Sequence, residues 1–141
     1  MKKIISIIIT LCISLSCTTV LAKDVTVNLN GQKIEFDVNP FIEDGRTLVP
    51  MRAIFEAVGA TVTWDNETRV AIALYEIDGV QNHIALQIDN TVAHVNETKT
   101  ELDVPARIVG DRTFVPLRFV SETIGKTVTW NQDTYTVDIT D

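Results

Sequence analysis

The residues of this 141-residue chain that could do chemistry are few, and none falls in a familiar catalytic pattern. The two histidines, His83 and His94, could meet across strands, but two histidines without a third ligand make a poor zinc or copper site. Both cysteines, Cys12 and Cys17, lie in an apolar N-terminal run, and Gly-rich phosphate loops and Gly-x-Ser-x-Gly motifs are absent. We predict no catalytic residue, no metal and no cofactor; a hydrolase that uses some pair among the 19 acidic residues is the alternative.

Arginine and glutamate residues form a more informative set, because the same pairs occur once in each half of the chain. They are Arg46, Arg52 and Glu56 in the first half and Arg112, Arg118 and Glu122 in the second. An exposed pair with a spacing of four on a helix contributes only about 0.3–0.5 kcal/mol. We interpret the helix arginines as structural clamps that reach a neighbouring strand or turn. The alternative is a groove that binds carboxylates of a wall peptide.

Two tryptophans, Trp64 and Trp130, stand at equivalent places, each at the end of a Thr-Val-Thr-Trp segment. In a strand, alternation puts the valine and the indole on one face. We predict that both indoles are core anchors, since tryptophan is highly buried on average. The alternative is a pair of exposed indoles that stack on sugar rings.

A duplication positions these residues. With a shift of 66, residues 29–68 align with residues 95–134, and 18 of the 40 positions are identical, whereas unrelated segments agree at about one position in fifteen. We place the repeats at about 25–73 and 91–139, joined by an inserted β-hairpin at 74–90. Because a unit of about 45 residues buries little core, we expect both repeats to form one domain, residues 23–141.

Each repeat is predicted to contain a strand, a turn, a short strand, one helix and two further strands. In the first repeat, Asn30 and Gly31 turn the chain between alternating segments at 25–29 and 34–38. Pro50 and Pro116 suit the first helical position, and Gly59 and Gly125 suit the left-handed residue after the helix. The fold class is therefore α+β, with twisted antiparallel sheets each packed on one short helix and two internal pseudo-repeats.

The last strands of the two repeats differ in hydrophobic spacing. Val70 and Ile72 lie six and eight residues after Trp64, whereas Val137 and Ile139 lie seven and nine residues after Trp130. A shift of one residue turns a strand over. We therefore predict that these two strands are not equivalent.

The pattern Gly-Arg-Thr-[Leu/Phe]-Val-Pro-[Met/Leu]-Arg, a short helix ending in glycine, and Thr-Val-Thr-Trp resembles the copper amine oxidase N-terminal domain, or stalk domain. The pattern is carried by residues 45–52, 59, 61–64, 103–105 and 112–130. The resemblance implies a non-catalytic accessory fold, a twisted antiparallel sheet wrapped around a helix, common in exported and surface proteins of Gram-positive bacteria. The copper in the family's name belongs to a different domain.

The N-terminal segment, residues 1–22, is predicted to be a cleaved signal peptide, because Lys2 and Lys3 precede an apolar run that ends at Ala22. An uncleaved membrane anchor and a lipoprotein acylated at Cys17 are the alternatives. Cleavage removes two lysines and takes the formal charge from −7 to −9, which repels nucleic acid and anionic polymers. The mature protein is then secreted or associated with the cell surface and has no membrane segment.

These features predict a non-catalytic secreted or cell-surface stalk or binding module. We expect its partner to be a cell-wall polymer or a surface or secreted protein, with a homodimer left open. A secreted inhibitor or regulator of an extracellular enzyme is the alternative function.

Overall fold

The computed structural model describes residues 24–141, so the predicted signal peptide at 1–22 and both cysteines lie outside the described residues. The described chain folds into three β-sheets and two short helices. The predicted α+β class is confirmed. Within residues 24–141, neither helix is long and apolar enough to cross a lipid bilayer.

The elements follow the duplicated order along the chain. The first repeat supplies β1 (Thr26–Leu29), β2 (Gln32–Lys33), β3 (Phe41–Glu43), β4 (Arg46–Pro50), α1 (Met51–Ala57), β5 (Thr61–Asp65) and β6 (Val70–Ile77). Strand β7 (Val80–Gln87) follows. The second repeat supplies β8 (Val92–Val95), β9 (Thr98–Glu101), β10 (Arg107–Val109), β11 (Arg112–Pro116), α2 (Leu117–Thr123), β12 (Thr127–Asn131) and β13 (Thr136–Thr140).

The central sheet joins the two repeats through their equivalent strands. Its order is β10-β11-β4-β3, and β4 and β11 are antiparallel with Val49 opposite Val115. Since these two valines are equivalent positions of the aligned repeats, the pair lies on the pseudo-twofold axis. Helix α1 contacts β11 and helix α2 contacts β4, so each helix packs on a strand of the other repeat.

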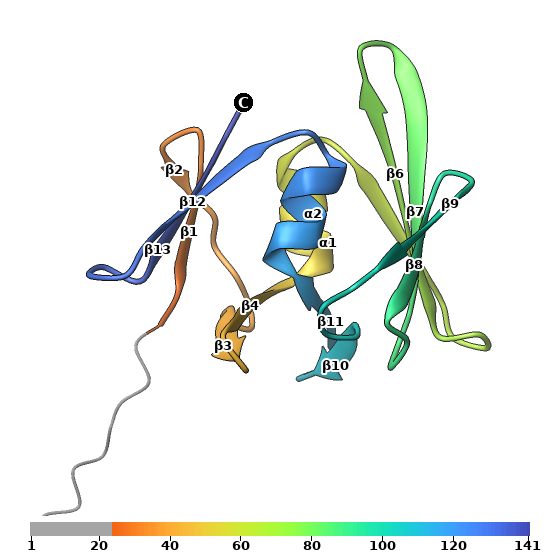
Figure 1. Ribbon diagram of the computed structural model, residues 1–141, viewed down its shortest axis with the longest axis horizontal. Coiled ribbons are helices and arrows are strands. Elements are labelled where there is room, and N and C mark those ends of the chain that lie inside the picture. Colours follow the sequence, from red (N-terminus) through yellow and green to blue (C-terminus); the bar gives the residue numbers. More distant parts are fainter. Residues whose placement is uncertain (1–23) are drawn as a thin grey trace, which may run out of the picture.

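The two outer sheets also combine the repeats, and they lie on opposite sides of the helices (Figure 1). One sheet has the order β12-β13-β1-β2, in which the last strand, β13, is parallel to the first, β1. The other has the order β5-β6-β7-β8-β9 and contains the extra strand β7 between β6 and β8. Beyond their neighbours, β6 and β7 continue as a two-stranded hairpin that projects from this sheet (Figure 1).

Both helices end in the same hydrogen-bond arrangement. The N–H groups of Gly59 and Ala60 donate to the carbonyls of Glu56 and Phe55, at 3.0 and 2.8 Å, as in a Schellman motif. Gly125 and Lys126 repeat the arrangement in the second copy. Gly59 has φ +87° and Gly125 has φ +72°, which confirms the predicted left-handed position. The prolines lie one position earlier than predicted, as the N-cap residues of the helices.

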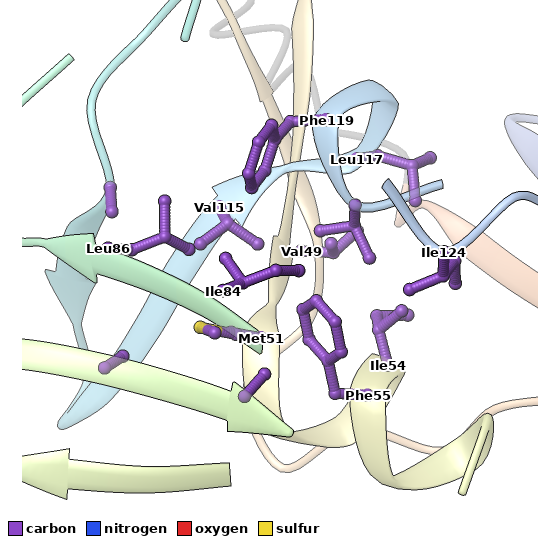
Figure 2. Packing of buried hydrophobic residues seen from close by; sticks show 14 of the residues in the cluster. Val49, Met51, Ile54, Phe55, Ile84, Leu86, Val115, Leu117, Phe119 and Ile124 are labelled. Carbon is purple, nitrogen blue, oxygen red and sulfur yellow. The ribbon is translucent and has the colours of Figure 1, made fainter. Parts of the chain in front are cut away.

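The core lies where the helices, the central strands and the outer sheets converge. Figure 2 shows Ile54 and Phe55 of α1 packed in one cluster with Val49, Val115 and the β7 residue Ile84, all fully buried. One continuous core spans both repeats, so neither repeat folds around a core of its own.

The predicted register slip between β6 and β13 is wrong. Trp64 lies opposite Ala71, and Trp130 lies opposite Val137, which is the equivalent of Ala71 in the second repeat. Strand β6 thus turns Ala71 and Ala73 inward, where β13 turns Val137 and Ile139 inward. Helix α1 carries Phe55 where α2 carries Ser121. The two strands therefore share one register and differ in the size of their inward side chains, and the apolar spacing misled the prediction.

The second strand predicted in each repeat is also displaced. Strand β2 covers only Gln32–Lys33, and residues 34–38 leave the sheet after the N–H of Ile34 donates to Val27 at 2.8 Å. The alternation at 34–38 instead belongs to an extended segment that brings Asp37 to Arg112 of the other repeat. Packing of Ile34 and Phe36 against the core, together with this contact between the repeats, holds the segment outside the sheet.

Replacing the helix-ending glycines tests the Schellman motifs. A Cβ atom on Gly59 or Gly125 would meet nothing within 4 Å, so Gly59→Ala or Gly125→Ala adds backbone strain without a collision. We expect each to lower the free energy of unfolding by about 1 kcal/mol in urea titrations. Gly59→Asn is the matched control. Because asparagine tolerates a positive φ, this variant should lose less unfolding free energy than Gly59→Ala. Unchanged stability in both alanine variants would contradict the assignment.

Tyr75 is predicted to make the fold sensitive to alkali. Burial raises the pKa of Tyr75 above its ordinary value of 10.0, and its hydroxyl donates to the carbonyl of Thr123 at 3.3 Å. Because the pKa of Tyr75 is higher in the folded state than in the unfolded state, its protonated hydroxyl stabilises the fold. This contribution is fully present at a pH below the pKa of the unfolded state, and it is lost as the pH rises through the pKa of the folded state. In urea titrations from about pH 8 to 11 we expect Tyr75→Phe to lose less stability with rising pH than the wild-type protein does. Equal losses in the variant and the wild-type protein would disprove the link.

Candidate binding site

The two tryptophans lie on the surface, so the prediction that they are core anchors is wrong. Trp64 is 36% exposed and Trp130 is 37% exposed. Alternation does place Val62 on the buried face of β5. However, the seven-residue α1 is about 10 Å long and the five-residue β5 about 16 Å, so the helix cannot cover the whole strand. The indole lies at the uncovered end.

Each indole lines an open pocket of about 690 Å³. The Trp64 pocket is formed by α1, β5, the segment 35–38 and the second-repeat residues Ile108 and 111–113. The Trp130 pocket is formed by α2, β12, the segment 100–103 and the first-repeat residues Ile42 and 45–47. All but two of the side chains that line the Trp64 pocket have their equivalent in the lining of the Trp130 pocket. The pockets are therefore two copies of one site.

An ion pair between the repeats borders each pocket. Arg46 Nε lies 2.9 Å from Asp103 Oδ2, and Arg112 Nη2 lies 2.9 Å from Asp37 Oδ2. The two pairs occupy equivalent positions in the aligned repeats. Sequence reasoning did not single out Asp37, although the identity of Asp37 and Asp103 in the alignment was a usable signal. These pairs give Arg46 and Arg112 a contact that bridges the repeats.

The helix arginines do not contact a neighbouring strand or turn in the way that was predicted for them. Arg52 stays on its own helix, with Nη1 3.7 Å from Glu56 Oε1 and both side chains more than half exposed. In the described part of the chain, no ion pair involves Arg118 or Glu122. The clamp interpretation is therefore wrong for the helix arginines, and both lie exposed in the pocket linings.

Polar turns hold the strand ends that carry the indoles. The N–H groups of Thr68 and Glu67 donate to Asp65 Oδ1 at 3.2 and 2.9 Å, and these bonds hold the pKa of Asp65 below its ordinary value of 3.8. Asn131 accepts the equivalent bonds in the second repeat. These side-chain to backbone hydrogen bonds fix the turn at the end of each strand.

The environments of the two indoles differ. Trp130 donates its indole N–H to Gln132 Oε1 at 2.9 Å, and Tyr135 meets its ring edge-on with centroids 5.5 Å apart. Arg69 occupies the position equivalent to Tyr135 and does not line the Trp64 pocket. Sequence reasoning missed Tyr135 because it has no aromatic equivalent in the first repeat.

The histidines lie in the sheet that contains the extra strand and are not direct cross-strand partners. His94 on β8 faces Ala85, and His83 on β7 pairs with Leu74 of β6. Among residues 24–141, no group of three or more histidine, cysteine, aspartate or glutamate side chains is arranged to hold a metal ion. The described residues therefore offer no fit for the copper in the name of the family that the sequence resembles.

Comparison with known proteins confirms the resemblance. The family model described as the copper amine oxidase N-terminal domain matches residues 28–139, and this chain belongs to that family. A Brevibacillus choshinensis protein named "Protease inhibitor" is 32% identical over 124 residues. The match covers 86% of this chain but only 36% of that relative, so the chain is similar to about a third of a longer protein.

The ion pairs between the repeats should couple weakly to stability. Arg46 and Asp103 are 46% and 51% exposed, so a double-mutant cycle with alanine should give a coupling of about 0.5 kcal/mol that falls in high salt. Asp37 is 80% exposed, so the double-mutant cycle for Arg112 and Asp37 should give a smaller coupling energy. The Arg52–Glu56 pair within α1 serves as the control cycle. No coupling for Arg46–Asp103 at low salt would contradict a bridging role.

Proposed function

We propose that this member of the copper amine oxidase N-terminal domain family is a non-catalytic exported module that binds another protein through its two pockets. The observation that carries the proposal is the location of the repeat-retained residues. Of the 18 identical pairs between the repeats, ten line the two pockets. Among them are both tryptophans, the helix arginines and glutamates, and both members of the ion pairs between the repeats.

The exposed members of this set are not needed to fill the core. Trp64, Arg52 and Glu56 are exposed, as are their equivalents. Exposed aromatic and charged residues that are identical in both repeats indicate a role in binding a partner rather than in packing the core. Tryptophan and arginine are also the residues that most often dominate the binding energy of protein interfaces. Ile42 and Ile108, 42% and 41% exposed, add an apolar contact to each pocket.

A protein partner fits the charge of the chain better than a wall polymer does. The formal charge of −7, or −9 after the predicted cleavage, repels anionic wall polymers at long range. Export is part of the proposal and is supported by the basic and apolar N-terminal segment of the sequence. The name of the Brevibacillus relative supports a protein as partner, and inhibition of an extracellular enzyme is the second candidate function.

The proposal is tested with the double variant Trp64→Ala, Trp130→Ala. We expect a secreted or surface protein of the native host to be retained on the immobilised wild-type protein and lost from the variant. Val80→Ala, at a residue 62% exposed outside both pockets, is the matched control and should retain it. Thermal melting and size-exclusion chromatography establish that each variant is folded and report its oligomeric state.

Two outcomes would count against protein binding through the pockets. Equal retention by the double variant would place the binding surface elsewhere. Sedimentation with purified cell walls, with or without calcium, in the absence of any protein partner would favour wall association instead. Inhibition assays against purified extracellular proteases test the second candidate, and inhibition that survives in the double variant would assign it to another surface.

A further inference from the structure

The two copies of the site differ in charge by two units. The Trp64 pocket is lined by Arg52 and Arg112 against four carboxylates, a formal charge of −2. The Trp130 pocket has three basic and three acidic residues and is neutral. Two replacements account for the difference: Asp111 stands where the other pocket has Gly45, and Lys126 stands where the first repeat has Ala60.

The positive groups of the Trp64 pocket already have carboxylate neighbours. Arg112 is paired with Asp37 and Arg52 lies beside Glu56. Among the described residues, no ion pair involves the carboxylate of Asp111. Glu35 has a loose contact with Lys33 at 3.9 Å, with side chains 84% and 60% exposed, which contributes little. Two carboxylates of this pocket are therefore available to a ligand.

We propose that the Trp64 pocket binds a basic side chain, lysine or arginine, of an extended segment of the partner protein. This inference rests on the proposed function and specifies its partner. An exposed indole attracts a cation through its ring face, and tryptophan is the best aromatic residue for this contact. Asp111 and Glu35 supply the opposite charge, and buried Met51 and Val62 border the pocket for the aliphatic stem of the bound side chain.

The net negative charge of the whole protein favours the same cationic ligand as the Trp64 pocket does. A net negative protein raises the association rate of a cationic partner, and the effect falls as salt shortens the Debye length. The Trp130 pocket suits a cation less well because Tyr135 packs against its indole and because Gly45 stands where the Trp64 pocket has the carboxylate of Asp111. The two copies of the site thus differ in ligand preference within one fold.

Intrinsic fluorescence tests this inference, because Trp64 and Trp130 are the two tryptophans of the chain. Trp130→Phe leaves Trp64 as the reporter, and Trp64→Phe leaves Trp130. The probes are three end-capped hexapeptides that share their apolar residues and carry two lysines, two glutamines or two glutamates. We expect the lysine peptide to bind the Trp64 pocket about fivefold to tenfold more tightly than the glutamine peptide and than it binds the Trp130 pocket. Its affinity should fall with added sodium chloride.

Asp111→Asn gives the sharpest variant, and Asp89→Asn is its matched control. Both aspartates are exposed and have positive φ, 60° and 63°, which asparagine tolerates, and both changes alter the net charge equally. Asp111→Asn should weaken the lysine peptide about threefold to fivefold at the Trp64 pocket, whereas Asp89→Asn, outside both pockets, should leave the affinity nearly unchanged.

The outcomes separate this inference from the proposed function. Equal responses to the lysine and glutamate peptides, or equal effects of Asp111→Asn and Asp89→Asn, would overturn the basic-segment assignment. If a partner protein is then still retained in a tryptophan-dependent manner, the proposed function stands with another ligand chemistry. If neither the peptides nor any partner protein depends on the tryptophans, both proposals fail.

Discussion

The antiparallel pairing of β4 with β11 is the contact on which the rest of the structure depends. It places the most strongly duplicated segment of the sequence against itself, with Val49 opposite Val115 on the pseudo-twofold axis. Each helix then packs on a strand of the other repeat, and each pocket takes an arginine from the opposite repeat. Because the pairing is self-complementary, one duplicated segment specifies both the joint between the repeats and the position of two equivalent sites.

This arrangement explains why a unit of about 45 residues can be stable as part of a pair. The outer sheets also mix the repeats, since β1 pairs with β13 and β7 connects β6 to β8. Nearly every buried side chain therefore belongs to one shared cluster. Contacts between residues far apart in the sequence form only after the chain has lost much of its conformational entropy. We therefore expect this fold to form slowly and cooperatively.

The sequence predicted the local backbone geometry correctly, but it did not predict which side chains of a strand the neighbouring elements bury. The duplication, the helix-ending glycines and the α+β class depend on identities and backbone preferences that are local, and the structure confirms them. The burial of Trp64 and the register of β6 depend on what lies above a strand. The helix is too short to cover the indole, and Ala71 and Ala73, rather than Val70 and Ile72, are the β6 residues buried in the core. Strand periodicity states which residues share a face but not how far the opposing element extends. Likewise, the retained arginines were recognisable, but not which aspartate they would meet.

The parallel pairing of β1 with β13 has a mechanical consequence. The chain enters this sheet at the start of β1 and leaves it at the end of β13, and because the strands run in the same direction these points lie at opposite ends of the pair. Tension applied to the two ends would slide β1 against β13 instead of peeling them apart. Hydrogen bonds along the whole register from Thr26–Thr136 to Leu29–Ile139 would then share the load. A hairpin opened from one end breaks its bonds one at a time, so this sheet should carry a higher force before it yields.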